Sequence, residues 1–149
     1  MIGALMRMPM DAVMGRIFAR LHEAGFTDLV PAHFQVLRYP GPQGRRPSDL
    51  AAEVRMTKQA MNYLLRQLEE LGYLTREDDA ADQRSKRIEL TERGYAAAKS
   101  IRATVRQIER EWERELGPRQ FAQLRRLLLD LNGTKLVRAH HANENGRPR

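Results

Sequence analysis

Apolar side chains recur at intervals of three and four residues along most of the chain, which is the spacing of one buried face on a helix. Two short apolar runs of the kind found in strands interrupt this pattern. The fold class is therefore mainly α, with a small two- or three-stranded antiparallel β element. The predicted helices cover residues 9–25, 31–39, 47–54, 57–71, 92–116, 118–132 and 135–141, and the predicted strands cover 73–76 and 88–90 on either side of a charged loop, 77–87.

Residues 57–71 have the clearest two-faced pattern. Thr57 is the expected N-cap and Gly72 the expected stop. The polar face carries Gln59 and Asn62 near its amino end, where amide groups can pair bidentately with adenine in a major groove. A surface helix with ordinary solvated residues remains the alternative. The apolar face consists of Ala60, Met61, Leu64, Leu65, Leu68 and Leu71, and the candidate DNA contacts are Thr57, Lys58, Gln59, Asn62, Tyr63 and Arg66, with Lys58 and Arg66 suited to phosphates.

Residues 47–54, with Ser48 as the expected N-cap, precede this helix by a turn of about three residues, as a helix-turn-helix requires. The end of the 57–71 helix and the residues that follow it, Leu68–Leu74, read Leu-Glu-Glu-Leu-Gly-Tyr-Leu. Further along come Asp82, Arg84, Leu90 and Thr91 in the pattern Asp-x-Arg, five residues, Leu-Thr. Over about residues 32–94 the chain resembles the MarR family of winged helix-turn-helix regulators. The resemblance implies a DNA-binding part over 31–91 and dimerisation helices over 9–25 and 92–141. The length of 149 residues predicts a single domain over 1–149, and the polar residues 142–149 predict a disordered tail.

The basic end of the charged loop suits a second contact with DNA. Arg84 at a hairpin tip can insert its planar guanidinium into a narrow minor groove. Asp82 is expected to hold the loop, Leu90 to pack on the core and Thr91 to cap the next helix. A solvated hairpin loop is the alternative. The further candidate DNA contacts here are Arg84, Ser85, Lys86 and Arg87.

Charge and composition narrow the function classes. The chain has 26 basic and 19 acidic residues and a net charge of +7, which favours an anionic partner, yet residues 44–87 hold nine basic and eight acidic side chains. Without cysteine, disulfides and thiolate metal sites are excluded, and without about eighteen consecutive apolar residues no membrane span is expected. The scattered histidines form no catalytic or metal motif. We therefore expect a cytoplasmic protein that is not an enzyme and needs no cofactor or metal.

The N-terminal helix and the two C-terminal helices have more apolar surface than the chain can evidently cover. A second copy would cover it through an isologous interface, so we expect a homodimer, with a monomeric helical core as the alternative. Two copies would contact half-sites about 34–36 Å apart on a pseudo-palindromic operator. The expected function is a sequence-specific repressor that binds double-stranded DNA. The alternative is a winged helix used for protein–protein contact or assembly without DNA.

The resemblance also implies a small aromatic or phenolic effector in a cleft between the DNA-binding part and the dimerisation helices. Arg16 or His33 would pair with a carboxylate. The sequence itself favours the alternative that His33 is a surface histidine and that the arginines lie along the surface. The candidate ligand residues are Arg16, Arg20, His33, Phe34 and Tyr39.

Overall fold

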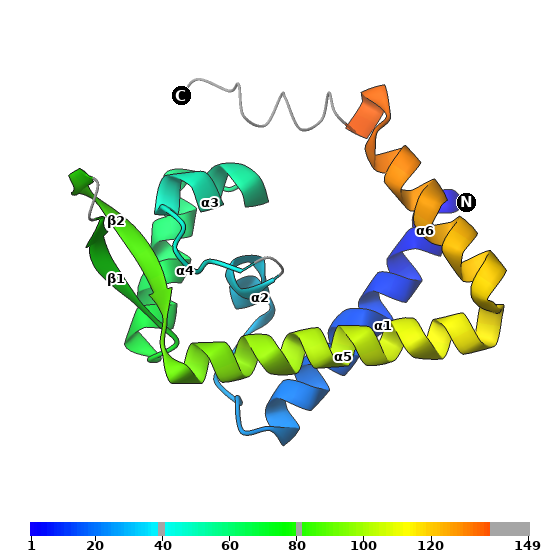
Figure 1. Cartoon of the computed structure of the whole chain (residues 1–149), viewed down its shortest axis with the longest axis horizontal. Helices are drawn as coiled ribbons and strands as arrows, with labels where there is room; N and C mark the ends of the chain where they lie inside the picture. Colours follow the sequence, from blue (N-terminus) through cyan, green and yellow to red (C-terminus); the bar gives the residue numbers. More distant parts are fainter. Residues whose placement is uncertain (39–40, 80–81, 138–149) are drawn as a thin grey trace. The chain divides into compact units, whose positions relative to one another are not determined.

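The computed structural model describes residues 1–38, 41–79 and 82–137, except for the side chains of 82–85. The chain divides into two compact units, Met1–Val105 and Arg106–Arg149. The predicted fold class is confirmed: among the described residues, helices predominate and the two strands pair antiparallel. The elements are α1 (Ile2–Glu23), α2 (Pro31–Leu37), α3 (Pro47–Val54), α4 (Lys58–Glu70), β1 (Leu74–Asp79), β2 (Asp82–Leu90), α5 (Glu92–Leu116) and α6 (Pro118–Asn132), as Figure 1 shows.

The first unit is built on one apolar core, to which α1, α2, α3, α4, both strands and the start of α5 contribute. The predicted apolar face of α4 is at its centre: Met61, Leu64, Leu65 and Leu68 are buried, while Ala60 and Leu71 at its edges are half-buried. Each buried aliphatic side chain of this kind stabilises the fold by about 1.5–3 kcal/mol. The other core residues are Ile17, Leu21, Leu29, Val36, Leu37, Leu50, Ala51, Tyr73, Leu74, Ile88, Ala97 and Ile101.

The ends of α4 follow the sequence prediction. The Thr57 hydroxyl accepts a hydrogen bond from the Ala60 backbone N–H at 3.1 Å, and Gly72 has a φ of +76°, the left-handed conformation that ends a helix. In the turn before α4, Arg55 also adopts a left-handed backbone, with φ of +60°. The turn between α3 and α4 therefore depends on one non-glycine residue in a costly conformation.

Two predicted helix starts are wrong. Helix α1 begins at Ile2, and Pro9 lies inside it, because the helix-favouring residues around Pro9 outweigh the one hydrogen bond that proline removes. Helix α3 has Arg46 as its N-cap, and Ser48 lies within its first turn. Pro47 takes the first helical position because its φ is already helical and its missing N–H needs no partner there.

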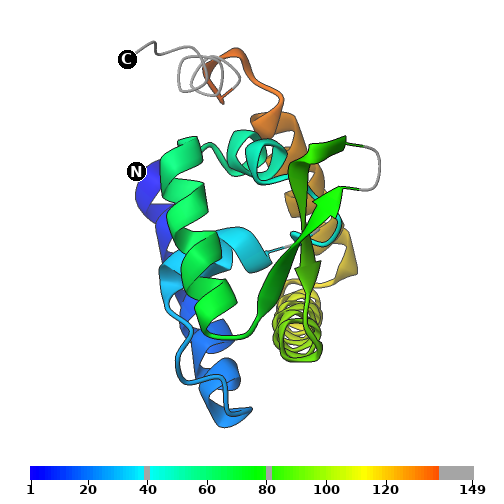
Figure 2. The same cartoon turned by 90° about the vertical axis from the view of Figure 1, so that its left-hand side faces the viewer.

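The segment predicted as a charged loop is largely strand, so the prediction of a loop over 77–87 is wrong. In the register of β1 and β2, Glu77 lies opposite Arg87 and Asp78 opposite Lys86. Opposite charges on facing positions stabilise an antiparallel pair, and Lys86 Nζ lies 2.6 Å from Asp78 Oδ1. The acidic and basic halves of the segment are therefore the two sides of one hairpin, termed the wing below, which Figure 2 shows as a twisted ribbon beside α4.

The segment before α3 lies along the outer edge of β2. The Gly44 N–H donates to the Ile88 carbonyl at 2.7 Å, and the Ile88 N–H donates to the Arg45 carbonyl at 2.9 Å. The Gln43 side-chain oxygen accepts from the Leu90 N–H at 2.6 Å. These bonds satisfy backbone groups that would otherwise be open on an edge strand, so the base of the wing is held on both sides.

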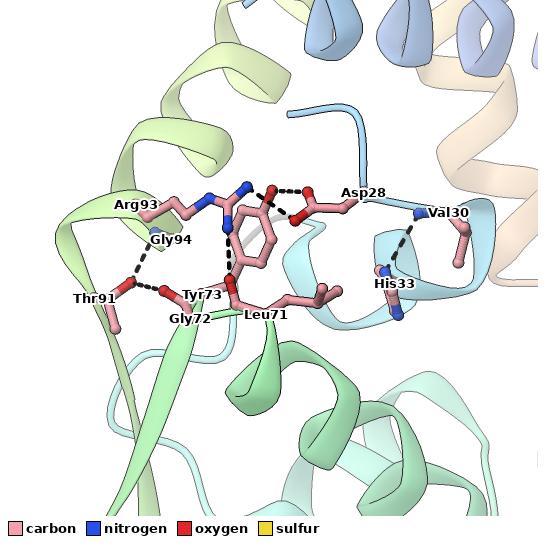
Figure 3. A network of polar contacts seen from close by, with 9 residues as sticks. All are labelled: Asp28, Val30, His33, Leu71, Gly72, Tyr73, Thr91, Arg93 and Gly94. Carbon is pink, nitrogen blue, oxygen red and sulfur yellow. Dashed lines mark hydrogen bonds and ion pairs between the residues drawn. The ribbon is translucent and has the colours of Figure 1, made fainter. Parts of the chain in front are cut away.

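A polar junction joins the end of α4 to the start of α5 (Figure 3). The Tyr73 hydroxyl donates to Asp28 Oδ1 at 2.5 Å, and the Arg93 guanidinium lies 4.4 Å from the Tyr73 ring centroid while donating to Asp28 and to the Leu71 carbonyl. Thr91 donates to the Gly72 carbonyl at 2.6 Å and accepts from the Gly94 N–H, which caps α5.

Gly94 is required at this junction, because an added Cβ would lie 1.9 Å from the Tyr73 carbonyl oxygen.

The junction also shifts the pKa values of two titrating groups. Burial would raise the pKa of the Asp28 carboxyl, but hydrogen bonds from Tyr73 and the backbone and the charge of Arg93 together lower it below its usual value. Burial, followed by the hydrogen bond to Asp28, raises the pKa of the Tyr73 phenol well above its usual range.

The second unit contains the end of α5 and all of α6. The prediction that the apolar stripe of α6 is buried is wrong for the single chain: Leu124, Leu127 and Leu128 are 37%, 53% and 42% exposed. Helix α6 has no buried residue. No helix within the described residues has the length and apolar character that crossing a membrane requires.

We predict that Tyr73→Phe lowers the free energy of unfolding by about 1 kcal/mol at neutral pH, because it removes a hydrogen bond to a carboxylate. The folded-state pKa of Asp28 is below its unfolded value, so this contribution exists above the unfolded value and is lost as pH falls through the folded one. The difference between wild type and variant in urea unfolding should therefore shrink in acid. Tyr95→Phe, which removes the hydroxyl of an exposed tyrosine, is the control. If the difference in unfolding free energy did not depend on pH, the stabilising hydrogen bond from Tyr73 to ionised Asp28 would be contradicted.

Candidate nucleic-acid interface

The polar face of α4 is open, opposite its buried stripe. Lys58, Gln59, Tyr63 and Arg66 are exposed, and Asn62 is half-buried at the side nearer β1. Helix α4 follows α3 through a short turn, as in a helix-turn-helix, so these side chains lie on the helix that such motifs place in the major groove. The structure thus brings together the candidate contacts that the sequence assigned to residues 57–66.

A buried carboxylate joins the wing to the start of α3. Asp79, at the end of β1, is 2% exposed. Its Oδ2 accepts from Arg46 Nη2 at 2.8 Å and Nε at 3.1 Å, and Arg87 Nε lies 3.0 Å from its Oδ1. A buried carboxylate is tolerated only with such partners, so Asp79 fixes where the wing lies relative to α3.

Arg87 therefore has a structural role in addition to the phosphate contact predicted for it. Its guanidinium also donates to the Gly44 carbonyl at 2.8 Å, and its side chain remains 43% exposed. Arg46 and Asp79 were missed by sequence reasoning. They are 33 residues apart, and no local pattern signals that they pair.

A basic notch opens between α3, α4 and the wing. Its volume is about 330 Å³. Four cationic side chains and the first turn of α3 face it, an arrangement that suits a phosphate of a nucleic-acid backbone. Lys58, Asn62 and Lys86 were predicted as DNA contacts, whereas Arg46, Ser48 and Arg76 were not. The residues that line the notch are Arg46, Pro47, Ser48, Lys58, Asn62, Arg76 and Lys86.

Comparison with known proteins agrees with this geometry. A family model described as the MarR family matches residues 27–85. The HTH-type transcriptional repressor Rv2887 of Mycobacterium tuberculosis is 35% identical over 85 residues, which are 57% of this chain and 61% of the repressor. The alignment thus spans about three fifths of the length of the curated relatives. Over residues 27–85 the chain is therefore similar to the MarR family.

Two solved MarR-family folds extend the likeness to most of the chain. The structure of Mycobacterium tuberculosis Rv2887 in complex with p-aminosalicylic acid has a TM-score of 0.61 and 29% identity, covering 89% of this chain and 98% of that one. The repressor CouR, bound to a 23-mer DNA duplex, has a TM-score of 0.69 and 22% identity, covering 88% of this chain and 92% of that one. The CouR likeness shows a shared fold.

Within the first unit, a chain of hydrogen bonds links α2 to the open face of α4. The backbone N–H of Val30 donates to His33 Nδ1 at 3.3 Å, so that nitrogen is the acceptor and Nε2 carries the ring hydrogen. His33 Nε2 lies 3.3 Å from Gln67 Oε1, and Gln67 Nε2 donates to the Tyr63 hydroxyl oxygen at 3.2 Å. The Tyr63 hydroxyl hydrogen is thereby left to point away from Gln67.

His33 is 3% exposed, so the expectation of a surface histidine is wrong. Its α2 backbone places it toward the core, where Gln67 and Val30 satisfy both ring nitrogens. His33 and Phe34 lie with Phe18, Leu21, Leu29, Val30, Leu37 and Ile101 around a space too small for a water molecule.

The other described candidate ligand residues do not line that space. Arg16 and Arg20 are exposed on α1, and Arg20 Nη1 lies 2.7 Å from Glu23 Oε2. Tyr39 lies outside the described residues.

The wing-tip candidates are only partly visible. The backbone of Asp82, Arg84 and Ser85 belongs to β2, but their side chains lie outside the described part of the structure. Lys86 is 54% exposed and faces the notch. At the base of the wing, Leu90 packs against the core.

We predict that Asp79→Ala lowers the free energy of unfolding by about 2 kcal/mol, because it removes the shared acceptor of two arginines. Arg46→Met and Arg87→Met should each cost less, because one arginine remains on the carboxylate. Asp78→Ala, which removes the neighbouring carboxylate in an exposed pair, should change stability little. Urea unfolding measures all four. Equal effects of Asp79→Ala and Asp78→Ala on stability would contradict the role of Asp79 as the shared partner of Arg46 and Arg87.

Proposed function

We propose that the chain is a transcriptional repressor that binds double-stranded DNA in a sequence-specific manner, as a homodimer on a pseudo-palindromic operator. The observation that carries this proposal is the basic notch beside the open polar face of α4. Groups suited to phosphates and groups suited to base edges lie side by side there, as DNA recognition needs. The repressor named as a relative and the DNA-bound MarR-family fold support it.

In this proposal α4 enters the major groove, and the phosphate contacts come from the notch. Lys58 and Lys86 face the phosphate directly. Arg84, together with Ser85 on the same strand, reaches an adjacent minor groove from the wing, whose position is set by Asp79. The competing function, a winged helix for protein contact alone, gives no reason for four cations to line one notch beside an open polar helix face.

The proposed homodimer rests on α6. Helix α6 exposes Leu124, Leu127 and Leu128 along one face, with Phe121 and Leu131 half-exposed on the same stripe. Adjacent exposed leucines of this kind indicate a surface that a partner covers. A second copy satisfies the two-fold symmetry of a palindromic operator, so we assign the 92–141 segment, with the 9–25 segment, to dimerisation.

A small aromatic or phenolic effector is part of the proposal. The Rv2887 structure contains p-aminosalicylic acid, and this chain is 29% identical to that protein over most of both lengths. An effector acts only if it binds the DNA-free arrangement more tightly than the DNA-bound one. The residues proposed for it remain Arg16, Arg20, His33, Phe34 and Tyr39, with His33 available only after its bonds to Val30 and Gln67 are exchanged.

We predict that duplex affinity falls steeply with salt and that Lys58→Ala reduces the slope of log K against log salt by about 1, the effect of one phosphate contact.

Arg84→Ala should lower the affinity for a site with A·T-rich flanks by at least about 1 kcal/mol. Fluorescence anisotropy of labelled duplexes measures both. Lys99→Ala, which removes an exposed cation of α5 outside the notch, is the control. A chain without duplex affinity at low salt would refute the proposed function.

We predict that Leu128→Glu converts the dimer into a monomer, because it places a charge in the covered apolar face. Arg126→Gln lowers the net charge by the same one unit on the side of α6 away from this stripe, and it should leave the dimer intact. Sedimentation velocity at micromolar concentration distinguishes the two states. A monomeric wild type, or a dimeric Leu128→Glu chain, would contradict the assignment of this face.

A further inference from the structure

Asn62 is held by a side chain from the wing. Arg76 in β1 donates from Nη1 to Asn62 Oδ1 at 3.4 Å, and from Nε to Glu69 Oε2 at 3.1 Å. The Arg76 side chain is only 22% exposed, and Asn62 itself is half-buried. The guanidinium is thus held by the Glu69 carboxylate while it contacts the Asn62 amide, which lies about two helical turns earlier in α4.

This contact decides which way the amide points. A guanidinium carries only donors, so the Asn62 oxygen, and not its nitrogen, faces Arg76. The electric field of the neighbouring cations favours the same orientation of the amide. Asn62 lines the notch with Arg46, Lys58 and Lys86 as well as Arg76, and the negative end of an amide dipole turns toward cations. The Nδ2 group therefore lies on the side of the amide carbon that faces away from Arg76.

An asparagine pairs with adenine by using both ends of its amide, the oxygen on N6–H and the nitrogen on N7. Arg76 occupies one of the two lone pairs of this oxygen and places a cation beside the other, where it opposes the approach of the adenine N6–H donor. The Nδ2 donor is then the end of the amide that is favoured for a base. A donor matches the acceptor edges of guanine, at N7 and O6, and of thymine, at O4. Adenine offers this donor only N7 and places its own N6–H donor beside it, so adenine is disfavoured relative to guanine, which differs from the pairing expected from the sequence.

We propose that Arg76 is a specificity-determining residue: by holding Asn62 Oδ1 it makes Asn62 a donor, so that each half-site carries guanine or thymine, not adenine, at the Asn62 position. This inference rests on the proposed DNA-binding function. Arg76 acts through Asn62 and is a positioning residue. Its removal frees the amide to pair with adenine, which should change base preference and not merely affinity.

The test is selection of bound duplexes from a random pool, followed by affinities for duplexes that differ at one position. Asn62→Ala first identifies that position, as the one whose preference it removes. Wild type should prefer guanine or thymine there. Arg76→Met, which keeps the length of the side chain and removes its donors, should shift preference toward adenine by about tenfold, the scale of one bidentate pair. The Arg76→Met/Asn62→Ala double variant should show no preference.

Lys86→Met is the matched control, because it removes one cation from the same notch and leaves the Arg76–Asn62 contact in place. It should lower affinity for all duplexes without changing the preference. If Arg76→Met behaves like Lys86→Met, Arg76 is a phosphate contact and the inference is overturned.

Wild type and Asn62→Ala alone also decide the question, whether or not Arg76→Met folds. An adenine preference in wild type that Asn62→Ala removes would overturn the inference, and so would an unchanged set of selected sequences. If no chain binds any duplex at low salt, the proposed function itself fails. Sequence-specific binding in which Asn62 prefers adenine would instead leave the proposed function standing and overturn the inference about Arg76 alone.

Discussion

The arrangement of the proposed DNA-binding part depends on one buried carboxylate, Asp79. A carboxylate that is removed from water must be paired, and here the two pairing arginines come from different elements: Arg46 precedes α3 and Arg87 lies in β2. Pairing is therefore possible only when the wing lies against the start of α3. The bonds between β2 and the segment at Gly44 and Arg45 hold the same strand from its outer edge.

Once the wing is placed, the side chains on α4 acquire defined hydrogen-bonding directions. On the side of the wing, Arg76 orients the Asn62 amide; on the side of α2, the chain from Val30 through His33 and Gln67 orients the Tyr63 hydroxyl. Side chains that are held before binding lose less conformational freedom when they meet a partner. Hydrogen bonds from the wing and from buried His33 thus restrain side chains on the solvent-exposed face of α4.

The sequence predicted α4, its N-cap and its glycine stop, because these depend on neighbours three or four residues away. It misplaced the start of α1, where helix propensity around Pro9 decides, and it took the paired strands at 77–87 for a loop, because pairing of charges across a hairpin depends on register. It missed Arg46, Asp79 and Arg76, whose partners lie far along the chain. The leucines of α6 were expected to be buried, but burial there requires surface that the second unit alone does not supply.

In the proposed function, α4 and the wing act as one DNA-binding surface because Asp79 holds them together. Hydrogen–deuterium exchange of the wild-type chain, with and without a selected duplex, tests it most directly. Backbone amides of α4 (Lys58–Glu70) and of both wing strands should become protected over the same range of duplex concentration, while those of α6 should exchange unchanged. Protection confined to α6, or protection of α4 with a wing that exchanges as in the free protein, would contradict it.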